Sequence, residues 1–207
     1  MRNMTYPLSR VFFTVYLKTC FRFEVCGKES IPDRSPFIIV ANHISYGDPV
    51  AMAIAFSKFK VIFIAKKELF HVPLFNVWFK SLGCIPIERW SGSSKPLKRS
   101  LKKLKEGGVL GIFPEGSRSI DGKLQKAQDG VGLIAAKSGV PIIPIYISGT
   151  DKALPRGKRM PRPCKIRVKV GKAVDITESL KINDRREIYG SIGEKIMESI
   201  SKLKDET

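Results

Sequence analysis

The chain has 207 residues, of which 37 are Lys or Arg and 19 are Asp or Glu, so its formal net charge is +18 at pH 7. A hydrophobic content of 43% with 27% charged residues fits a globular protein and excludes a disordered chain, which combines low hydrophobicity with high net charge. The excess of positive charge favours an anionic partner: nucleic acid, an acidic membrane surface, or a phosphorylated or CoA-like substrate.

The apolar runs of the sequence are short. Runs such as Pro36–Ala41, Pro49–Phe56 and Val61–Ala65 fall well below the ~18–20 apolar residues that a membrane-spanning helix needs. We also expect no signal peptide, because basic residues interrupt the first apolar stretch and no small-residue cleavage site follows it. The four cysteines form no CxxC pair and the chain has only two histidines, which argues against a zinc site and favours reduced thiols in a cytosol-facing protein.

Short β-branched runs alternate with longer stretches of helical period. Strands are predicted at Arg22–Val25, Phe37–Ala41, Val61–Ala65, Cys84–Glu88, Val109–Phe113, Ile142–Ile147 and Lys165–Val170. Helices are predicted at Leu8–Thr19, Pro49–Ser57, Pro73–Leu82, Lys95–Glu106, Val131–Ser138 and Arg185–Lys204. This alternation predicts an α/β fold, with a mostly parallel central sheet flanked by helices in a single domain over residues 24–207. The Pro- and base-rich stretch Leu154–Pro163 predicts a loop.

Residues 1–23 are predicted to form an N-terminal amphipathic helix that contacts a membrane. The stretch Leu8–Phe23 would be about 24 Å long as a helix, short of the ~30 Å hydrocarbon core. It therefore either lies in the membrane interface with its basic residues toward the headgroups or packs on the protein core. If it only anchors the protein, removing residues 1–23 would leave the site folded. Pro73–Leu82 and the basic stretch Lys95–Lys105 are further candidates for membrane contact.

Ionisable residues follow four of the predicted strands. Asn42-His43 follows the first apolar strand, Lys66-Lys67 the second, Arg89 the third, and Pro114-Glu115-Gly116-Ser117-Arg118 the fourth. Ligands of open α/β sheets bind at the carboxyl ends of the strands. These positions therefore predict a site where a base and several cations meet, although polar residues at one strand end alone would mean only solvent contact.

His43 and Asp48 are the candidate catalytic pair. Residues five apart lie on different faces of a continuous helix, so the two side chains can meet only if His43 lies in a strand-to-helix turn. Asp48 before Pro49 predicts a helix N-cap, which would place the turn there. An aspartate on one imidazole nitrogen fixes the tautomer and leaves the other nitrogen free to accept a proton. The alternative is a histidine and an aspartate that only cap a turn and a helix.

Four blocks of the sequence carry a resemblance to a known family. Asn42–Asp48 matches the NHxxxxD motif of glycerolipid acyltransferases, and Phe113–Ser119 matches their FPEGxRS block. Gly83–Arg89 and Val140–Ile145 resemble the second and fourth blocks, with Cys84 where the family often has a polar residue. The chain is thus similar to the 1-acylglycerol-3-phosphate acyltransferases.

The resemblance implies transfer of an acyl group from acyl-CoA or acyl carrier protein to the hydroxyl of lysophosphatidate, which yields phosphatidic acid for phospholipid synthesis. It implies that His43 is the general base and that Asp48 orients it, with no acyl-enzyme, no metal and no cofactor beyond the acyl donor. Residues implied to bind the phosphate and glycerol of the acceptor are Arg89, Glu115, Gly116, Arg118 and Lys66. Glu115 would bond glycerol hydroxyls or orient an arginine.

The resemblance also places the reaction at the cytosolic face of a membrane, the inner membrane in a bacterium, with the protein bound as a peripheral or monotopic protein. Another lysophospholipid or a lyso-aminolipid stays open as the acceptor. A basic nucleic-acid-binding protein is the remote alternative: the charge permits it, but no nucleic-acid motif is present and the FPEGSRS block would be left unexplained. We therefore expect no nucleic-acid partner.

Overall fold

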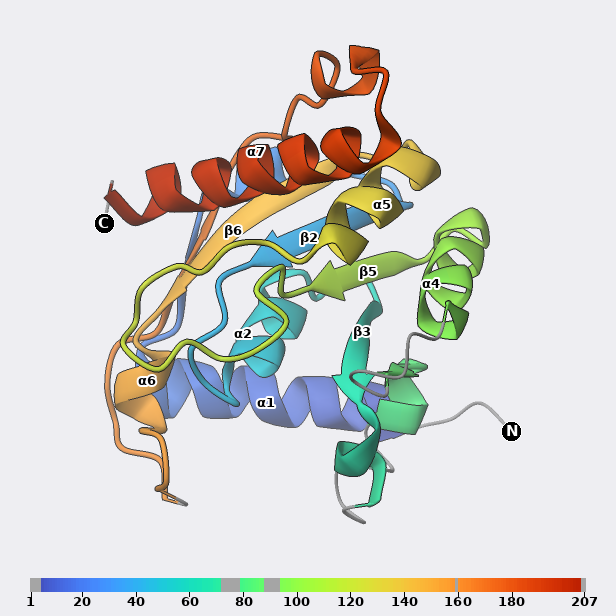
Figure 1. Ribbon diagram of the computed structural model, residues 1–207. Coiled ribbons are helices and arrows are strands. Elements are labelled where there is room, and N and C mark those ends of the chain that lie inside the picture. The colour runs from blue at the N-terminus through green and yellow to red at the C-terminus, as the bar shows by residue number, and fades with distance from the viewer. Residues whose placement is uncertain (1–4, 72–78, 88–93, 159, 206–207) are drawn as a thin grey trace.

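The computed structural model describes residues 5–71, 79–87, 94–158 and 160–205. One sheet runs through it in the strand order β1-β7-β6-β2-β5-β3-β4 (Figure 1). Its strands are β1 Glu24–Cys26, β2 Phe37–Ala41, β3 Val61–Lys66, β4 Ile85–Ile87, β5 Val109–Ile112, β6 Ile142–Ser148 and β7 Arg167–Val170. β2 lies at the centre and is parallel to both of its neighbours, β5 and β6.

The sheet is mostly parallel, as predicted, with one reversal. β7 runs antiparallel to β6 and pairs in parallel with β1 at the edge. β1 begins at Glu24, two residues after the predicted start, because Arg22 takes a left-handed backbone conformation with φ 44° and breaks the chain direction there. The predicted strand Cys84–Glu88 is observed as Ile85–Ile87, and its last residue lies outside the described residues.

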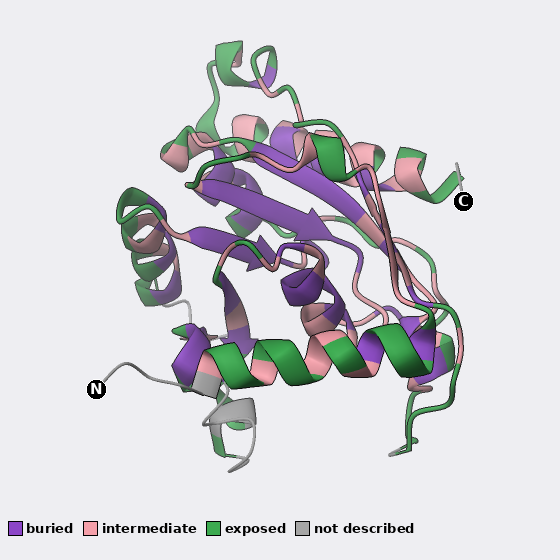
Figure 2. Cartoon of the chain, turned by 180° about the vertical axis from the view of Figure 1, so that it is seen from behind, coloured by how far each residue is buried: buried purple, intermediate pink, exposed green. Residues whose placement is uncertain are grey.

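Helices cover both faces of the sheet, which makes three layers (Figures 1 and 2). α1 (Thr5–Phe21) and α2 (Asp48–Ala55) lie on one face. α4 (Lys95–Lys105), α5 (Asp129–Ser138) and α7 (Arg185–Asp205) lie on the other. The predicted helix over 73–82 falls mostly outside the described residues, and its last part, 79–82, is helical. The short helix α6 (Thr150–Ala153) after β6 was not predicted.

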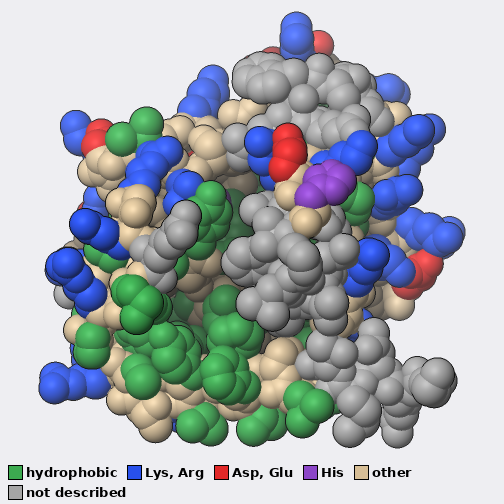
Figure 3. Space-filling view, turned by 90° about the horizontal axis from the view of Figure 1, so that it is seen from below, with side chains coloured by type: hydrophobic (Ala, Val, Ile, Leu, Met, Phe, Trp, Pro, Cys, Tyr) green, Lys and Arg blue, Asp and Glu red, His purple; other side chains and the backbone are tan. Residues whose placement is uncertain are grey.

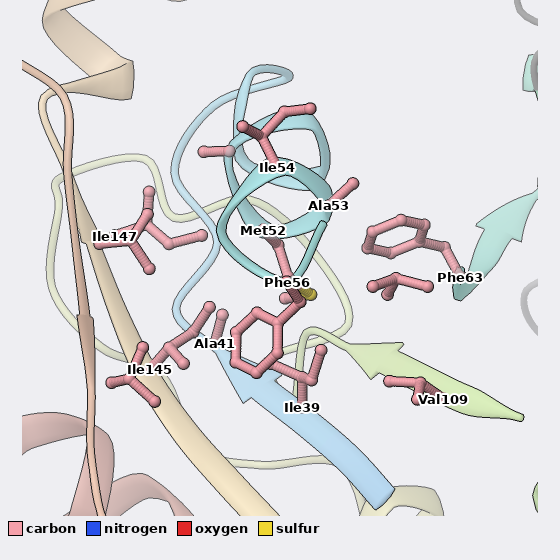
Figure 4. Packing of buried hydrophobic residues seen from close by; sticks show 14 of the residues in the cluster. Ile39, Ala41, Met52, Ala53, Ile54, Phe56, Phe63, Val109, Ile145 and Ile147 are labelled. Carbon is pink, nitrogen blue, oxygen red and sulfur yellow. The ribbon is translucent and has the colours of Figure 1, made fainter. Parts of the chain in front are cut away.

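Alternate residues of the central strand serve two separate cores. Phe37, Ile39 and Ala41 of β2 point into the cluster under α1 and α2, whereas Ile38 and Val40 point into the cluster under α5 and α7. This is the period of two that a strand buried on both faces imposes. Figure 4 shows side chains of α2 and of the neighbouring strands meeting in the first of these cores. The core holds the strand ends in a fixed frame, and the site is built on them.

α1 is part of the packed unit. Leu17 and Phe21 are buried in the core under α2, and the Tyr6 hydroxyl donates a hydrogen bond to the Phe59 carbonyl at 2.9 Å. The structure therefore supports the alternative in which this helix packs on the protein core, so that its removal would disturb the domain. The opposite side of α1 is apolar and exposed, at Leu8, Val11, Phe12 and Val15. Among the described residues, no helix combines the length and the apolar character that crossing a bilayer requires.

Candidate active site

The site begins where β2 ends. Asn42, the next residue, is buried, and its side chain both donates a hydrogen bond to the backbone of Ile147 on β6 and accepts one from it. Its side-chain amide donates to the Ile147 carbonyl at 2.9 Å, and its side-chain oxygen accepts the Ile147 N–H at 2.7 Å. The side chain thus continues the β2–β6 ladder by one step after the backbone has turned away. This pair of bonds fixes the start of the turn that carries His43.

His43 and Asp48 meet, as predicted. The Nδ1 atom of His43 lies 2.8 Å from Oδ2 of Asp48, which is fully buried. The same oxygen accepts the backbone N–H groups of Ile44 at 2.7 Å and of Ser45 at 2.8 Å. An oxygen that takes these N–H donors acts as an acceptor, so Nδ1 of the neutral ring carries the proton and donates it. The other ring nitrogen, Nε2, is then the one that can accept a proton.

The predicted N-cap at Asp48 is wrong in detail. α2 begins at Asp48 itself, and Gly47 occupies the N-cap position. The carboxylate does not cap the helix but folds back over the turn that precedes it, while its second oxygen, Oδ1, accepts the Thr150 hydroxyl at 2.5 Å. Four donors therefore hold this buried carboxylate in one orientation.

The imidazole is also held by its face. The ring of Phe113, directly after β5, stacks on the ring of His43 with the centroids 4.1 Å apart and an angle of 21° between the planes. Phe63 of β3 in turn stacks with Phe113, with the ring centroids 6.4 Å apart. Three neighbouring strands thus supply an aromatic column that fixes the plane of the ring, while Asp48 fixes its rotation.

Glu115 contacts the backbone of His43, and the residue is only 3% exposed. One oxygen accepts the backbone N–H of His43 at 2.9 Å, and the other accepts the N–H of Gln125 at 3.2 Å. Burial raises the pKa of this carboxyl, and the two backbone N–H groups oppose the rise. This position differs from the expectation that Glu115 bonds glycerol hydroxyls or an arginine: the carboxylate holds two backbone segments together.

The segment after β5 is tied to His43 a second time. The backbone N–H of Ser119 donates to the His43 carbonyl at 2.7 Å. Between the two ties the chain turns at Gly116, whose φ of 70° is the left-handed conformation that favours glycine. A Cβ atom at Gly116 would also come within 3.1 Å of the Gln128 side chain. The glycine of this motif is therefore required by the turn itself.

Arg118 projects beside the same turn. Its guanidinium carbon lies 3.6 Å from the centre of the Tyr46 ring, which itself is exposed. A guanidinium stacked on an aromatic ring keeps its edge N–H groups available for an anion. Arg118 thus lies close in space to the His43–Asp48 turn, although 70 residues separate it from Asp48 in the sequence.

The other predicted cations are placed less closely. Lys66 is the last residue of β3, which is separated from β2 by β5, and its Nζ atom lies 3.1 Å from the carboxylate of Glu68. Arg89 lies outside the described residues. Of the predicted site residues, the structure thus brings together His43, Asp48, Glu115, Gly116 and Arg118.

Cys84 is buried and lies directly before β4. Loss of solvent raises the pKa of its thiol to about 12. A thiolate is the nucleophilic form of cysteine, so this side chain is inert at neutral pH. In the part of the chain that the structure describes, no group of three or more His, Cys, Asp and Glu side chains is arranged to hold a metal ion.

Three contributors to the site were not singled out from the sequence: Thr150, Tyr46 and Phe113. Phe113 and Tyr46 lie inside the motifs that carried the resemblance, so their positions were available but not their contacts. Thr150 lies 102 residues from Asp48 and reaches it only because β6 pairs with β2. The signal in the sequence was a polar Gly-Thr pair directly after a buried strand, the same pattern that marked the other strand ends.

Comparisons with known proteins agree with this geometry. The family profile described as Acyltransferase matches residues 22–148. The chain is 31% identical over 159 residues to the chloroplastic 1-acyl-sn-glycerol-3-phosphate acyltransferase of Brassica napus, covering 75% of this chain and 46% of the relative. It is 32% identical over 183 residues to the 1-acyl-sn-glycerol-3-phosphate acyltransferase of Streptococcus pneumoniae, covering 86% of this chain and 65% of the relative.

The fold is also similar to a crystal structure. The 1-acyl-sn-glycerophosphate (LPA) acyltransferase of Thermotoga maritima superposes with a TM-score of 0.76 and 30% sequence identity, over 94% of this chain and 78% of that one. The chain spans about half the length of the plant relative and about two thirds of the streptococcal one. The profile match covers more than half of the chain and contains both the His43–Asp48 turn and the Glu115–Arg118 segment. The chain therefore belongs to the acyltransferase family that includes the 1-acyl-sn-glycerol-3-phosphate acyltransferases.

Proposed function

We propose that the protein transfers an acyl group from acyl-CoA or acyl carrier protein to the free hydroxyl of 1-acylglycerol-3-phosphate, giving phosphatidic acid. The observation that carries the proposal is the contact of 2.8 Å between His43 Nδ1 and the buried carboxylate of Asp48. An alcohol is too weak an acid to attack a thioester unaided, so the reaction needs a base placed for the transition state. The oriented imidazole meets that need.

The steps follow from the tautomer. Nε2 of His43 accepts the proton of the acceptor hydroxyl as its oxygen attacks the thioester carbonyl, and Asp48 stabilises the imidazolium that forms. The carbon–sulfur bond then breaks, and the imidazolium returns the proton to the leaving thiolate. The protein forms no covalent intermediate, which agrees with the inert, buried thiol of Cys84.

Arg118 is the best placed group for the phosphate of the acceptor. A guanidinium binds phosphate through two parallel hydrogen bonds. Because stacking on Tyr46 already restricts the Arg118 side chain, it loses less conformational entropy when it binds. We propose that Arg89 and Lys66 add positive charge to the same phosphate, and that the exposed turn at Gly116 lets the backbone approach the glycerol. No metal or cofactor other than the acyl donor takes part in this scheme.

The acceptor and product are lipids, so we propose that the protein works on the cytosolic face of a membrane, the inner membrane in a bacterium. The exposed apolar side of α1 supports this. Figure 3 views the molecule from below and shows hydrophobic side chains gathered in a patch, with Lys and Arg around the edges of the face. Large apolar side chains framed by bases are typical of a helix lying in the interface of an anionic bilayer.

The test is an acyl-transfer assay on lysophosphatidate that offers acyl-CoA and acyl carrier protein in parallel with donors of several chain lengths. His43→Ala should lower kcat by about 10²–10⁴, the usual cost of removing a general base. His71→Ala is the matched control, because His71 is the other histidine of the chain and is exposed. A His43→Ala protein that folds normally and keeps more than a tenth of the wild-type rate would overturn the proposal.

The acceptor is tested in the same assay. Other lysophospholipids and a lyso-aminolipid are offered beside lysophosphatidate. Transfer to one of these but not to lysophosphatidate would keep His43 as the base and reassign the acceptor. Arg118→Ala then shows whether a phosphate is bound, because its loss should raise the KM only for acceptors that carry the phosphate monoester.

A further inference from the structure

Residues 154–163, which we name the basic loop, leave the body of the protein directly after α6. The loop is described apart from residue 159. Its ends are closed by a hydrogen bond of 2.7 Å from the Arg162 N–H to the Ala153 carbonyl, and a turn inside it is closed by the Lys158 N–H and the Pro155 carbonyl at 3.0 Å. The stem is thus fixed to the domain, whereas the residues between are presented to solvent.

The tip of the basic loop combines an apolar side chain with bases. Met160 is 79% exposed, and Arg156, Lys158 and Arg162 around it are exposed as well. In the described part of the chain, none of these three bases takes part in an ion pair. Bases without an ion-pair partner are available to an anionic surface, and the unbranched apolar side chain beside them can enter the apolar layer below such a surface.

The basic loop lies on the same side of the molecule as α1. In Figure 1 the segment after α6 extends from the lower edge of the molecule, beside the end of α1, and Figure 2 shows the same arrangement from behind. The chain that leaves the loop is bonded to that end of α1, since the Ile166 N–H donates to the Phe21 carbonyl at 2.9 Å. The exposed apolar side of α1 and the tip of the loop can therefore touch one flat surface together.

The stem of the basic loop also borders the catalytic turn. Thr150 at the start of α6 binds Asp48, and the Ser45 hydroxyl donates to the Leu154 carbonyl at 3.3 Å. A membrane surface that binds the loop would therefore keep the His43–Asp48 turn at a short and fixed distance from that surface. Binding of a soluble anionic partner to the loop would not require the loop to border the His43–Asp48 turn. An enzyme whose acceptor is a lipid does benefit, because the membrane that binds the loop also presents the acceptor close to this turn.

We propose that the basic loop is a second membrane-binding element, in which Met160 enters the interface and Arg156, Lys158 and Arg162 bind anionic headgroups. The inference deepens the proposed function, on which its catalytic benefit rests. Each base near an anionic surface strengthens binding about fivefold. Burial of part of a methionine adds about threefold to tenfold. If α1 alone touched the membrane, the whole protein could rotate about the axis of this helix. A second contact through the basic loop fixes its orientation on the membrane.

The experiment measures binding of the full chain to vesicles of neutral phosphatidylcholine, with and without anionic phosphatidylglycerol, at low and at physiological salt. A triple variant, Arg156→Gln, Lys158→Gln and Arg162→Gln, should bind the anionic vesicles at least tenfold more weakly. Met160→Ser should weaken binding about threefold and leave its salt dependence unchanged. The matched control replaces three exposed bases of α7, Arg185, Arg186 and Lys204, by Gln, which removes the same charge from the opposite side of the molecule.

The outcomes separate this inference from the proposed function. Vesicle binding needs no catalysis, so it stands or falls without any acyl transfer. If transfer occurs, the loop variants should keep the wild-type kcat on detergent-dispersed acceptor and lose rate on acceptor held in vesicles. Wild-type binding by the triple variant, or an equal loss by the α7 control, would overturn the proposal. So would a triple variant that loses binding to acyl carrier protein or to nucleic acid while its vesicle binding is unchanged.

Discussion

The carboxylate of Glu115 holds the backbone of His43, accepting its N–H at 2.9 Å from a position 72 residues away in the sequence. The carbonyl of the same histidine accepts the N–H of Ser119 at 2.7 Å. Both backbone groups of His43 are thus bound by the segment that follows β5. The acidic residue of the FPEGSRS block therefore fixes the backbone of His43, and the arginine of the block stacks on Tyr46 beside the same turn.

Replacement of Glu115 by Gln should show a pH-dependent effect. Burial raises the pKa of this carboxyl in the folded protein, so the native state binds its proton more tightly than the unfolded chain does. The contribution of Glu115 to the free energy of unfolding is therefore complete below the unfolded pKa and falls as the pH rises through the folded one. The unfolding free energy of wild type minus that of Glu115→Gln, measured by denaturant titration, should become smaller or more negative from pH 4 to pH 8. An increase over that range would mean that the two N–H donors outweigh burial.

Thr150→Val should weaken both the fold and the reaction. Valine keeps the shape of threonine but removes the hydroxyl that binds Oδ1 of the buried Asp48. A lost hydrogen bond to a buried charge costs about 1.5–3 kcal/mol of stability, which a thermal melt detects. Because Asp48 would then hold the imidazole less firmly, kcat should fall while the KM of each substrate stays nearly constant. Thr150→Ser keeps the hydroxyl and is the control. If kcat falls as much in the serine variant as in the valine variant, the role given to the Thr150 hydroxyl is contradicted.

Much of this site follows from strand patterns alone. β2, β3, β5 and β6 are nearly continuous apolar runs, and such runs are distinctive because both faces of a central strand are buried. Once these strands are parallel, their carboxyl ends must meet at one edge, so the approach of the His43 turn to the segment after β5 was predictable. The contact of His43 with Asp48 followed from the requirement for a turn between them.

The remainder depends on registers and contacts that no local pattern encodes. Thr150 reaches Asp48 only through the pairing of Ile39 with Ile143 and its neighbours, a register that is set by packing. Asp48 before Pro49 has the pattern of a capping residue, but its carboxylate instead binds the partly buried His43 side chain and the backbone N–H groups of Ile44 and Ser45. The sequence of α1 is apolar on two sides and is compatible with both membrane contact and core packing; the structure uses one of these sides for the core.

Tyr46 should control how well Arg118 binds its anion. Tyr46→Ala removes the ring that lies 3.6 Å from the guanidinium, an interaction that contributes about 0.5–1 kcal/mol at an exposed site. The KM for the phosphorylated acceptor should therefore rise about twofold to fivefold, with the KM for the thioester unchanged. Tyr46→Phe keeps the stacked ring and should behave as wild type. A rise in KM for the phenylalanine variant would show that the hydroxyl, and not the ring, contacts the substrate.

Substitutions on the two sides of α1 should separate membrane contact from folding. Val11 and Phe12 are more than half exposed, so replacing both by Ser should leave the thermal melt unchanged and lower the fraction of protein that floats with anionic vesicles. Leu180→Ser is the matched control, because this leucine is an exposed apolar residue of the short helix Ser179–Lys181.

Leu17→Ala, on the buried side of α1, should instead cost about 2–5 kcal/mol of stability. Deletion of residues 1–23 should unfold the domain by exposing the core under α2. A double variant of Val11 and Phe12 that melts early would show that this side also packs on protein. One that melts normally and still floats like wild type would leave the basic loop as the dominant anchor.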